Sequence, residues 1–128
     1  MHFFDSSALA KLILDEAESP AIAAYLTKTA TIVASDLARA ELTRAVRRSA
    51  VDRLPRVTAL FERLHLVPVT GSILTSAGRL LPPGLRTLDA IHLASALLLQ
   101  GDLQAFVTYD QRQRDAAIQL GLLVNSPS

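Results

Sequence analysis

The chain has 128 residues, 50% of them hydrophobic, which is enough to fill one core and excludes a disordered chain. Its 13 basic and 12 acidic residues leave a net charge of +1, so any attraction to phosphate must come from a local patch. The absence of cysteine excludes disulfides and thiolate metal sites. We therefore expect a single globular domain over residues 1–128.

No targeting or membrane segment is evident. The N-terminal HFFDSSALAKLIL lacks a basic leader, and the longest nearly apolar stretch, residues 88–99, holds an Asp and a His and is too short to cross a bilayer. We expect a soluble, cytoplasmic protein that contacts no membrane.

Short β-branched or aromatic runs alternate with segments of helical periodicity. The predicted strands are residues 2–4, 31–34, 66–69, 105–108 and 122–124. Because these runs are apolar throughout, they are typical of a parallel sheet with helices on both faces. Pro68 places the third strand at an edge. The pattern predicts an α/β fold, a three-layer α/β/α domain with a mostly parallel five-stranded sheet.

The helix starts carry capping residues. The predicted N-caps are Asp5 or Ser6, Ser35 or Asp36, and Thr87. Gly121 is expected to close the last helix before the final strand.

Four acidic residues occupy positions that surface charge explains poorly. They are Asp5 after the first strand, Glu41 in a helical apolar stripe, Asp89 at the head of LDAIHLASALLL, and Asp110 after the fourth strand. A half-buried carboxylate is costly unless it is hydrogen-bonded, paired or bound to a metal. Ligand sites in open parallel sheets lie beyond the carboxyl ends of the strands, and all four acids project toward that predicted edge. Their conjunction favours a shared metal site.

Each acid also has an ordinary explanation. Asp5 and Asp110 suit helix N-caps, and Asp89 complements a helix dipole. Glu41 can pair with Arg44 three residues later or extend its side chain to water. Only the joint pattern distinguishes a shared site from four acids with separate structural roles.

The donor set indicates which metal would bind. Carboxylate oxygens without a His or Cys cluster suit Mg²⁺ or Mn²⁺. Asp115 is interpreted as a solvated helix charge, although it is close enough in sequence to substitute as a ligand. His92, one turn after Asp89, is interpreted as a core or supporting group and not a ligand.

Four segments carry a family resemblance: HFFDSSALAKL, SDLARAELTRA, LRTLDAIHLASAL and FVTYDQRQRDAA. In order and spacing they resemble the acidic motifs of PIN-domain ribonucleases, most closely the VapC toxins of bacterial toxin–antitoxin pairs. The resemblance covers essentially the whole chain. It matches the family's acidic quartet to Asp5, Glu41, Asp89 and Asp110, with no acid missing.

The resemblance implies a metal-dependent endoribonuclease. Asp5 and Asp89 would be the principal metal ligands, Asp110 would complete the shell, and Glu41 would orient a metal-bound water for in-line attack on an RNA phosphodiester. The expected products carry a 5′-phosphate and a 3′-hydroxyl. Thr108 is either a hydrogen-bond donor to a ligand or phosphate or simply a β-branched strand residue.

Substrate and partners follow from the same resemblance. Arg39, Arg47 and Arg86 are candidate contacts to the RNA backbone, with a solvated helix face as the equal alternative. The family implies a cognate VapB-like antitoxin and a homodimer. Two other functions stay open: a non-catalytic RNA- or protein-binding module whose acids hold a structural cation, and a PIN nuclease in RNA processing outside a toxin role.

Overall fold

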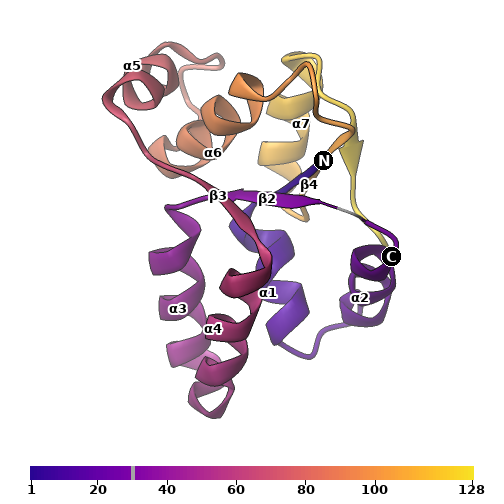
Figure 1. Cartoon of the computed structure of the whole chain (residues 1–128). Coiled ribbons are helices and arrows are strands. Elements are labelled where there is room, and N and C mark those ends of the chain that lie inside the picture. The colour runs from indigo at the N-terminus through magenta and orange to yellow at the C-terminus, as the bar shows by residue number, and fades with distance from the viewer. Residues whose placement is uncertain (30) are drawn as a thin grey trace.

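The computed structural model describes residues 1–29 and 31–128. Strands and helices alternate along the chain (Figure 1). The elements are β1 (His2–Phe4), α1 (Ser6–Ile13), α2 (Ser19–Thr27), β2 (Ile32–Ser35), α3 (Ala38–Ser49), the 3₁₀ turn η1 (Val51–Arg53), α4 (Leu54–Arg63), β3 (His65–Val67), α5 (Gly71–Arg79), α6 (Thr87–Leu98), β4 (Ala105–Val107), α7 (Gln111–Gln119) and β5 (Val124–Asn125).

The strands form one five-stranded sheet in the order β3-β2-β1-β4-β5, and every neighbouring pair is parallel. The predicted parallel sheet is therefore confirmed. Strand β3 lies at an edge, as Pro68 directly after it predicts. The last strand begins at Val124, two residues later than predicted, because Gly121 and the following residues connect it to α7.

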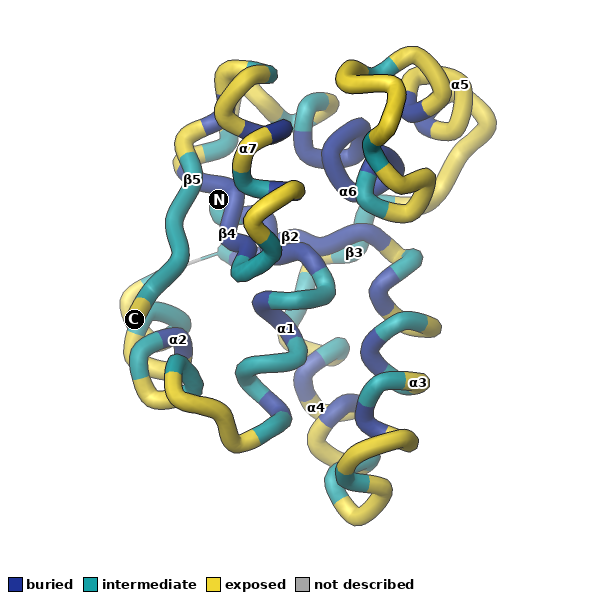
Figure 2. The backbone as a smooth tube through the Cα atoms, turned by 180° about the vertical axis from the view of Figure 1, so that it is seen from behind, coloured by how far each residue is buried: buried dark blue, intermediate teal, exposed yellow. Residues whose placement is uncertain are grey.

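Helices cover both faces of the sheet, with α1 to α4 on one side and α5 to α7 on the other (Figure 1). Successive strand residues point to opposite faces. Phe4 and Val107 pack in the core cluster beneath α1 and α3, whereas Phe3 and Phe106 pack in the cluster beneath α6 and α7. The rings of Phe3 and Phe106 are stacked, with centroids 5.5 Å apart. Figure 2 shows β2 and β4 as largely buried backbone between the two helical layers.

Capping residues set two helices as predicted. The Asp5 carboxylate accepts a hydrogen bond from the backbone N–H of Ala8 and caps α1. Asp110 accepts from two backbone N–H groups in the first turn of α7. Gly121, with φ of 87°, follows the end of α7 in the left-handed conformation that glycine adopts readily.

Two other predicted caps are wrong. Helix α3 begins at Ala38, because Ser35 instead accepts from the N–H of Leu37 in the preceding turn, and Asp36 pairs with Arg39. Thr87 is the first residue of α6 and not its cap. Within the described part of the chain, every helix is too short or too polar to cross a membrane.

Candidate active site

The four acids lie at the N-termini of four different helices. Asp5 and Asp110 are the N-cap residues of α1 and α7, and Glu41 and Asp89 lie in the first turns of α3 and α6. The N-terminal end of a helix carries partial positive charge, which favours a nearby carboxylate. The caps predicted at Asp5 and Asp110 and the dipole explanation of Asp89 therefore hold. The contacts described next link the four acids through neighbouring side chains at the carboxyl ends of the strands.

Asp5 is the most buried of the four, with 4% of its surface exposed. One carboxylate oxygen, Oδ1, accepts from Ser7 Oγ at 2.6 Å and from the Ala8 N–H at 3.1 Å. The other, Oδ2, accepts from Thr108 Oγ1 at 2.5 Å. Burial raises the pKa of Asp5, and these hydrogen bonds oppose that rise. The carboxylate is thus held in one orientation by three donors.

Thr108 connects the ends of β1 and β4. Its hydroxyl donates to Asp5 and accepts from the Asp110 N–H at 3.1 Å. Ser7 makes a parallel connection, because its hydroxyl accepts from the Tyr109 N–H at 2.9 Å. Thr108 therefore has a defined hydrogen-bonding partner in the acidic site, while its contact with a ligand or phosphate stays a prediction.

Glu41 is held by Ser6 and His92 and not by Arg44, the ion-pair partner considered from sequence. Its Oε1 accepts from Ser6 Oγ at 2.7 Å and lies 2.5 Å from His92 Nε2. Burial would raise the pKa of Glu41, but the hydrogen bonds from His92 and Ser6, with the electrostatic attraction of His92, outweigh burial and lower it. Glu41 therefore favours its ionised form.

Asp89 and Asp110 share one cation, the guanidinium of Arg86. Arg86 Nε lies 3.0 Å from Asp89 Oδ2, and its Nη2 lies 2.9 Å from Asp110 Oδ2. The hydrogen bond to Asp89 and the charges of both carboxylates raise the pKa of Arg86. The Arg86 side chain is 60% exposed, so water and salt screen these pairs.

The site consists of an inner pair, Asp5 and Glu41, and an outer pair, Asp89 and Asp110. Among residues 1–29 and 31–128, no three His, Asp or Glu side chains form a group that could hold a metal ion in this arrangement. The donor chemistry still suits Mg²⁺ or Mn²⁺, because the ligands are carboxylate oxygens and the outer pair already binds a cation between its members.

The other predicted residues are placed as follows. Arg39 pairs with Asp36 at 2.6 Å and lies over the Phe61 ring, and Arg47 is exposed on the same helix, α3. Asp115 is exposed and accepts from Gln111 Nε2 at 2.8 Å. None of the three makes a described side-chain contact with the four acids.

Sequence reasoning missed the supporting roles of Ser6 and Ser7. The two serines directly after Asp5 were a usable signal, because small hydroxyl residues at a helix start can hydrogen-bond neighbouring groups. His92 was interpreted as a core or supporting group, but the sequence did not show which residue it supports, since its partner Glu41 is 51 positions away.

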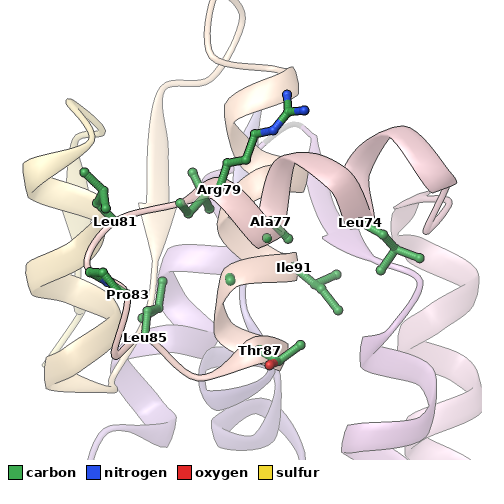
Figure 3. Close-up of a pocket in the computed structure, with 11 residues that line it drawn as sticks. Leu74, Ala77, Arg79, Leu81, Pro83, Leu85, Thr87 and Ile91 are labelled. Carbon is green, nitrogen blue, oxygen red and sulfur yellow. The ribbon is translucent and has the colours of Figure 1, made fainter.

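Two surface hollows differ in chemistry. One, of about 330 Å³, lies between α5, α6 and the loop before α6 (Figure 3), and its lining is mainly apolar and includes no acid. The other, of about 210 Å³, is lined by both members of the Arg86–Asp89 pair and by Arg112 and Asp115. Concave space therefore adjoins Asp89 of the outer pair.

Comparisons with known proteins identify the family. The PIN domain family matches residues 2–119. Ribonuclease VapC46 of Mycobacterium tuberculosis is 45% identical over 126 residues, covering 98% of this chain and 97% of that protein.

Solved structures share the fold at lower identity. The crystal structure of Mycobacterium tuberculosis VapC20, described as a Sarcin-Ricin loop cleaving toxin, superposes with a TM-score of 0.78 at 18% identity, covering 99% of this chain and 100% of that one. A toxin–antitoxin complex from Klebsiella pneumoniae contains a chain with a TM-score of 0.76 at 18% identity, covering 100% and 98%.

Proposed function

The chain belongs to the PIN-domain family as a VapC-type toxin ribonuclease, and we propose that its four carboxylates hydrolyse RNA phosphodiester bonds with Mg²⁺ or Mn²⁺. The observation that carries this proposal is the meeting of the inner and outer pairs at one sheet edge. Thr108 joins the two pairs through Asp5 and the Asp110 N–H.

In this proposal Asp5, Asp89 and Asp110 hold the metal. When bound, the metal would lower the pKa of water and offset charge on the phosphate in the transition state. Asp5 is held in one orientation by three donors, which fixes the direction from which its carboxylate would meet the metal. Asp89 and Asp110, which now contact Arg86, would supply the remaining carboxylate ligands.

Glu41 orients the attacking water. Both of its hydrogen bonds, from Ser6 and His92, end on Oε1, so Oε2 is free of protein partners among the described residues. Because the pKa of Glu41 is lowered, the carboxylate is ionised near neutral pH and can accept a hydrogen bond from water.

Arginines counter the repulsion between the carboxylates and RNA. Arg86 would bind the phosphate nearest the outer pair, and the exposed Arg39 and Arg47 on α3 would contact the RNA backbone further away. Such contacts are sensitive to salt, because binding releases counterions from the nucleic acid. The expected products carry a 5′-phosphate and a 3′-hydroxyl.

The proposal includes partners and location. A VapB-like antitoxin neutralises the nuclease, and the toxin is a homodimer that acts in the cytoplasm. The similarity to a chain of the Klebsiella pneumoniae toxin–antitoxin complex supports the antitoxin, through the shared fold.

RNA cleavage by the purified protein tests the proposal. A mixed RNA pool is incubated with Mg²⁺, Mn²⁺ or chelator, and product ends are mapped. We expect metal-dependent cuts at few sites and a loss of more than about 100-fold in Asp5→Asn, beyond the usual effect of a group that only supports a ligand.

Asp15→Asn is the matched control, because Asp15 is an exposed carboxylate that pairs with Arg53 away from the site. It should cleave like the unaltered protein. If the folded protein cuts no RNA with either metal, the nuclease assignment is wrong and the non-catalytic binding module takes its place.

A further inference from the structure

His92 is a buried polar residue in the most apolar helix of the fold. It lies in α6, where all residues from Ala90 to Ala96 are buried, and only 2% of its own surface is exposed. A polar ring in such surroundings is unfavourable unless hydrogen bonds replace those it made with water. The roles proposed above for the four acids leave this ring without a function of its own.

The contacts of His92 lead to the carboxylate proposed to orient water. His92 Nε2 lies 2.5 Å from Glu41 Oε1 and 3.3 Å from Ser6 Oγ. An ionised carboxylate only accepts hydrogen bonds, so Nε2 is the donor in its contact with Glu41. Ser6 donates to the same oxygen at 2.7 Å.

We propose that His92 is a positioning residue that, together with Ser6, holds Glu41 by Oε1 so that Oε2 is directed at the substrate water. The three residues come from α1, α3 and α6, so the contact joins helices from both faces of the sheet. Two donors on one oxygen fix the carboxylate plane more firmly than either alone.

The other ring nitrogen argues against a purely structural histidine. His92 Nδ1 is buried and has no hydrogen-bond partner among the described residues. Native structures leave few buried polar atoms unpaired, and an apolar side chain at this position would avoid the penalty. The unpaired Nδ1 therefore lowers the stability of the fold, and the contact of Nε2 with Glu41 offsets this loss.

Two substitutions separate positioning from packing. His92→Phe keeps a planar ring but removes the donor, whereas His92→Gln keeps an N–H near the position of Nε2. The inference rests on the proposed nuclease function, and we expect His92→Phe to lower kcat about 10- to 100-fold with little change in KM. His92→Gln should restore most of that loss.

A double-mutant cycle tests whether His92 acts through Glu41. In a Glu41→Gln background, adding His92→Phe should lower kcat by no more than about twofold, because the residue it positions is already impaired. An equal loss in both backgrounds, or wild-type kcat in His92→Phe, would overturn the inference.

A measurement independent of cleavage keeps the inference testable if the nuclease proposal fails. The carboxyl ¹³C resonance of Glu41 is followed against pH in the unaltered protein and both variants. The pKa of Glu41 should rise in His92→Phe and return toward the unaltered value in His92→Gln. An unchanged pKa in His92→Phe would show that His92 does not hold this carboxylate, whether or not the protein cuts RNA.

Discussion

The inner and outer pairs of carboxylates are held by different kinds of contact. Asp5 and Glu41 are surrounded by hydroxyl, imidazole and backbone donors from short, packed elements. Asp89 and Asp110 rely on one exposed arginine for their bridging contact. The donors around the inner pair are fixed dipoles, which hold a reacting group in place without rearrangement. The long, solvated side chain of Arg86 can move away when another cation binds. The inner pair is therefore preorganised, and the outer pair is adjustable.

Thr108→Val should weaken the inner pair most. Valine has nearly the same shape, but it leaves Asp5 Oδ2 without its donor and the Asp110 N–H without its acceptor. Leaving a buried carboxylate oxygen and a partly buried N–H unpaired costs about 3 kcal/mol, so we expect a loss of that size in the free energy of unfolding. Urea denaturation with chelator present measures it.

Thr108→Ser is the control for that prediction. It keeps the hydroxyl and removes one buried methyl group, which costs about 1 kcal/mol. If serine destabilises the protein more than valine, packing of the methyl group and not the hydrogen bonds holds this part of the site.

Glu41→Gln should have a smaller effect that depends on pH. The pKa of Glu41 is lowered in the folded protein from an ordinary value of 4.5, so the ionised carboxylate stabilises the fold. This contribution is fully present above pH 4.5 and is lost as pH falls through the lower folded value.

We therefore expect Glu41→Gln to cost about 1 kcal/mol at pH 7 and progressively less below pH 4.5. Urea denaturation of both proteins across this range gives the difference directly. A difference that grows on acidification would contradict the lowered pKa.

Arg86→Gln should produce the smallest change, confined to the outer pair. Removing the guanidinium frees Asp89 and Asp110, so Mn²⁺ should bind up to about fivefold more tightly, a factor set by the weakness of exposed ion pairs. Calorimetric titration of the metal measures the change. KM for RNA should rise, because a phosphate contact is lost.

Arg48→Gln removes the same charge from an exposed position on α3. It should leave Mn²⁺ affinity unchanged. If both substitutions tighten metal binding equally, the effect comes from net charge and not from release of the outer pair.

Local signals predicted the fold well. Uninterrupted apolar runs predicted the parallel sheet, and Pro68 predicted the edge position of β3. The caps at Asp5 and Asp110 were predictable because a cap is decided within four residues. The cap predicted at Ser35 or Asp36 was wrong because both residues can also stabilise a turn, as they do before α3.

The hydrogen-bond partners of the four acids could not be predicted from short-range sequence patterns. Spacing on a parallel sheet predicts that the acids share an edge, but it says nothing about which donor faces which oxygen. Arg86 was expected to contact RNA, and its contact with Asp110 crosses 24 positions. His92 and Glu41 are separated by 51 positions, and only the packing of α3 and α6 brings them together.

The bond from Thr108 to Asp5 joins residues 103 positions apart. Strand β1 lies in the middle of the sheet beside β4, although β4 is synthesised about a hundred residues later. A nascent chain on the ribosome therefore carries Asp5 without its partner until translation has passed Thr108. We expect a cell that synthesises this toxin to be exposed to cleavage only by chains that extend past Thr108, and ribosome-stalled fragments ending before Thr108 to cut no RNA.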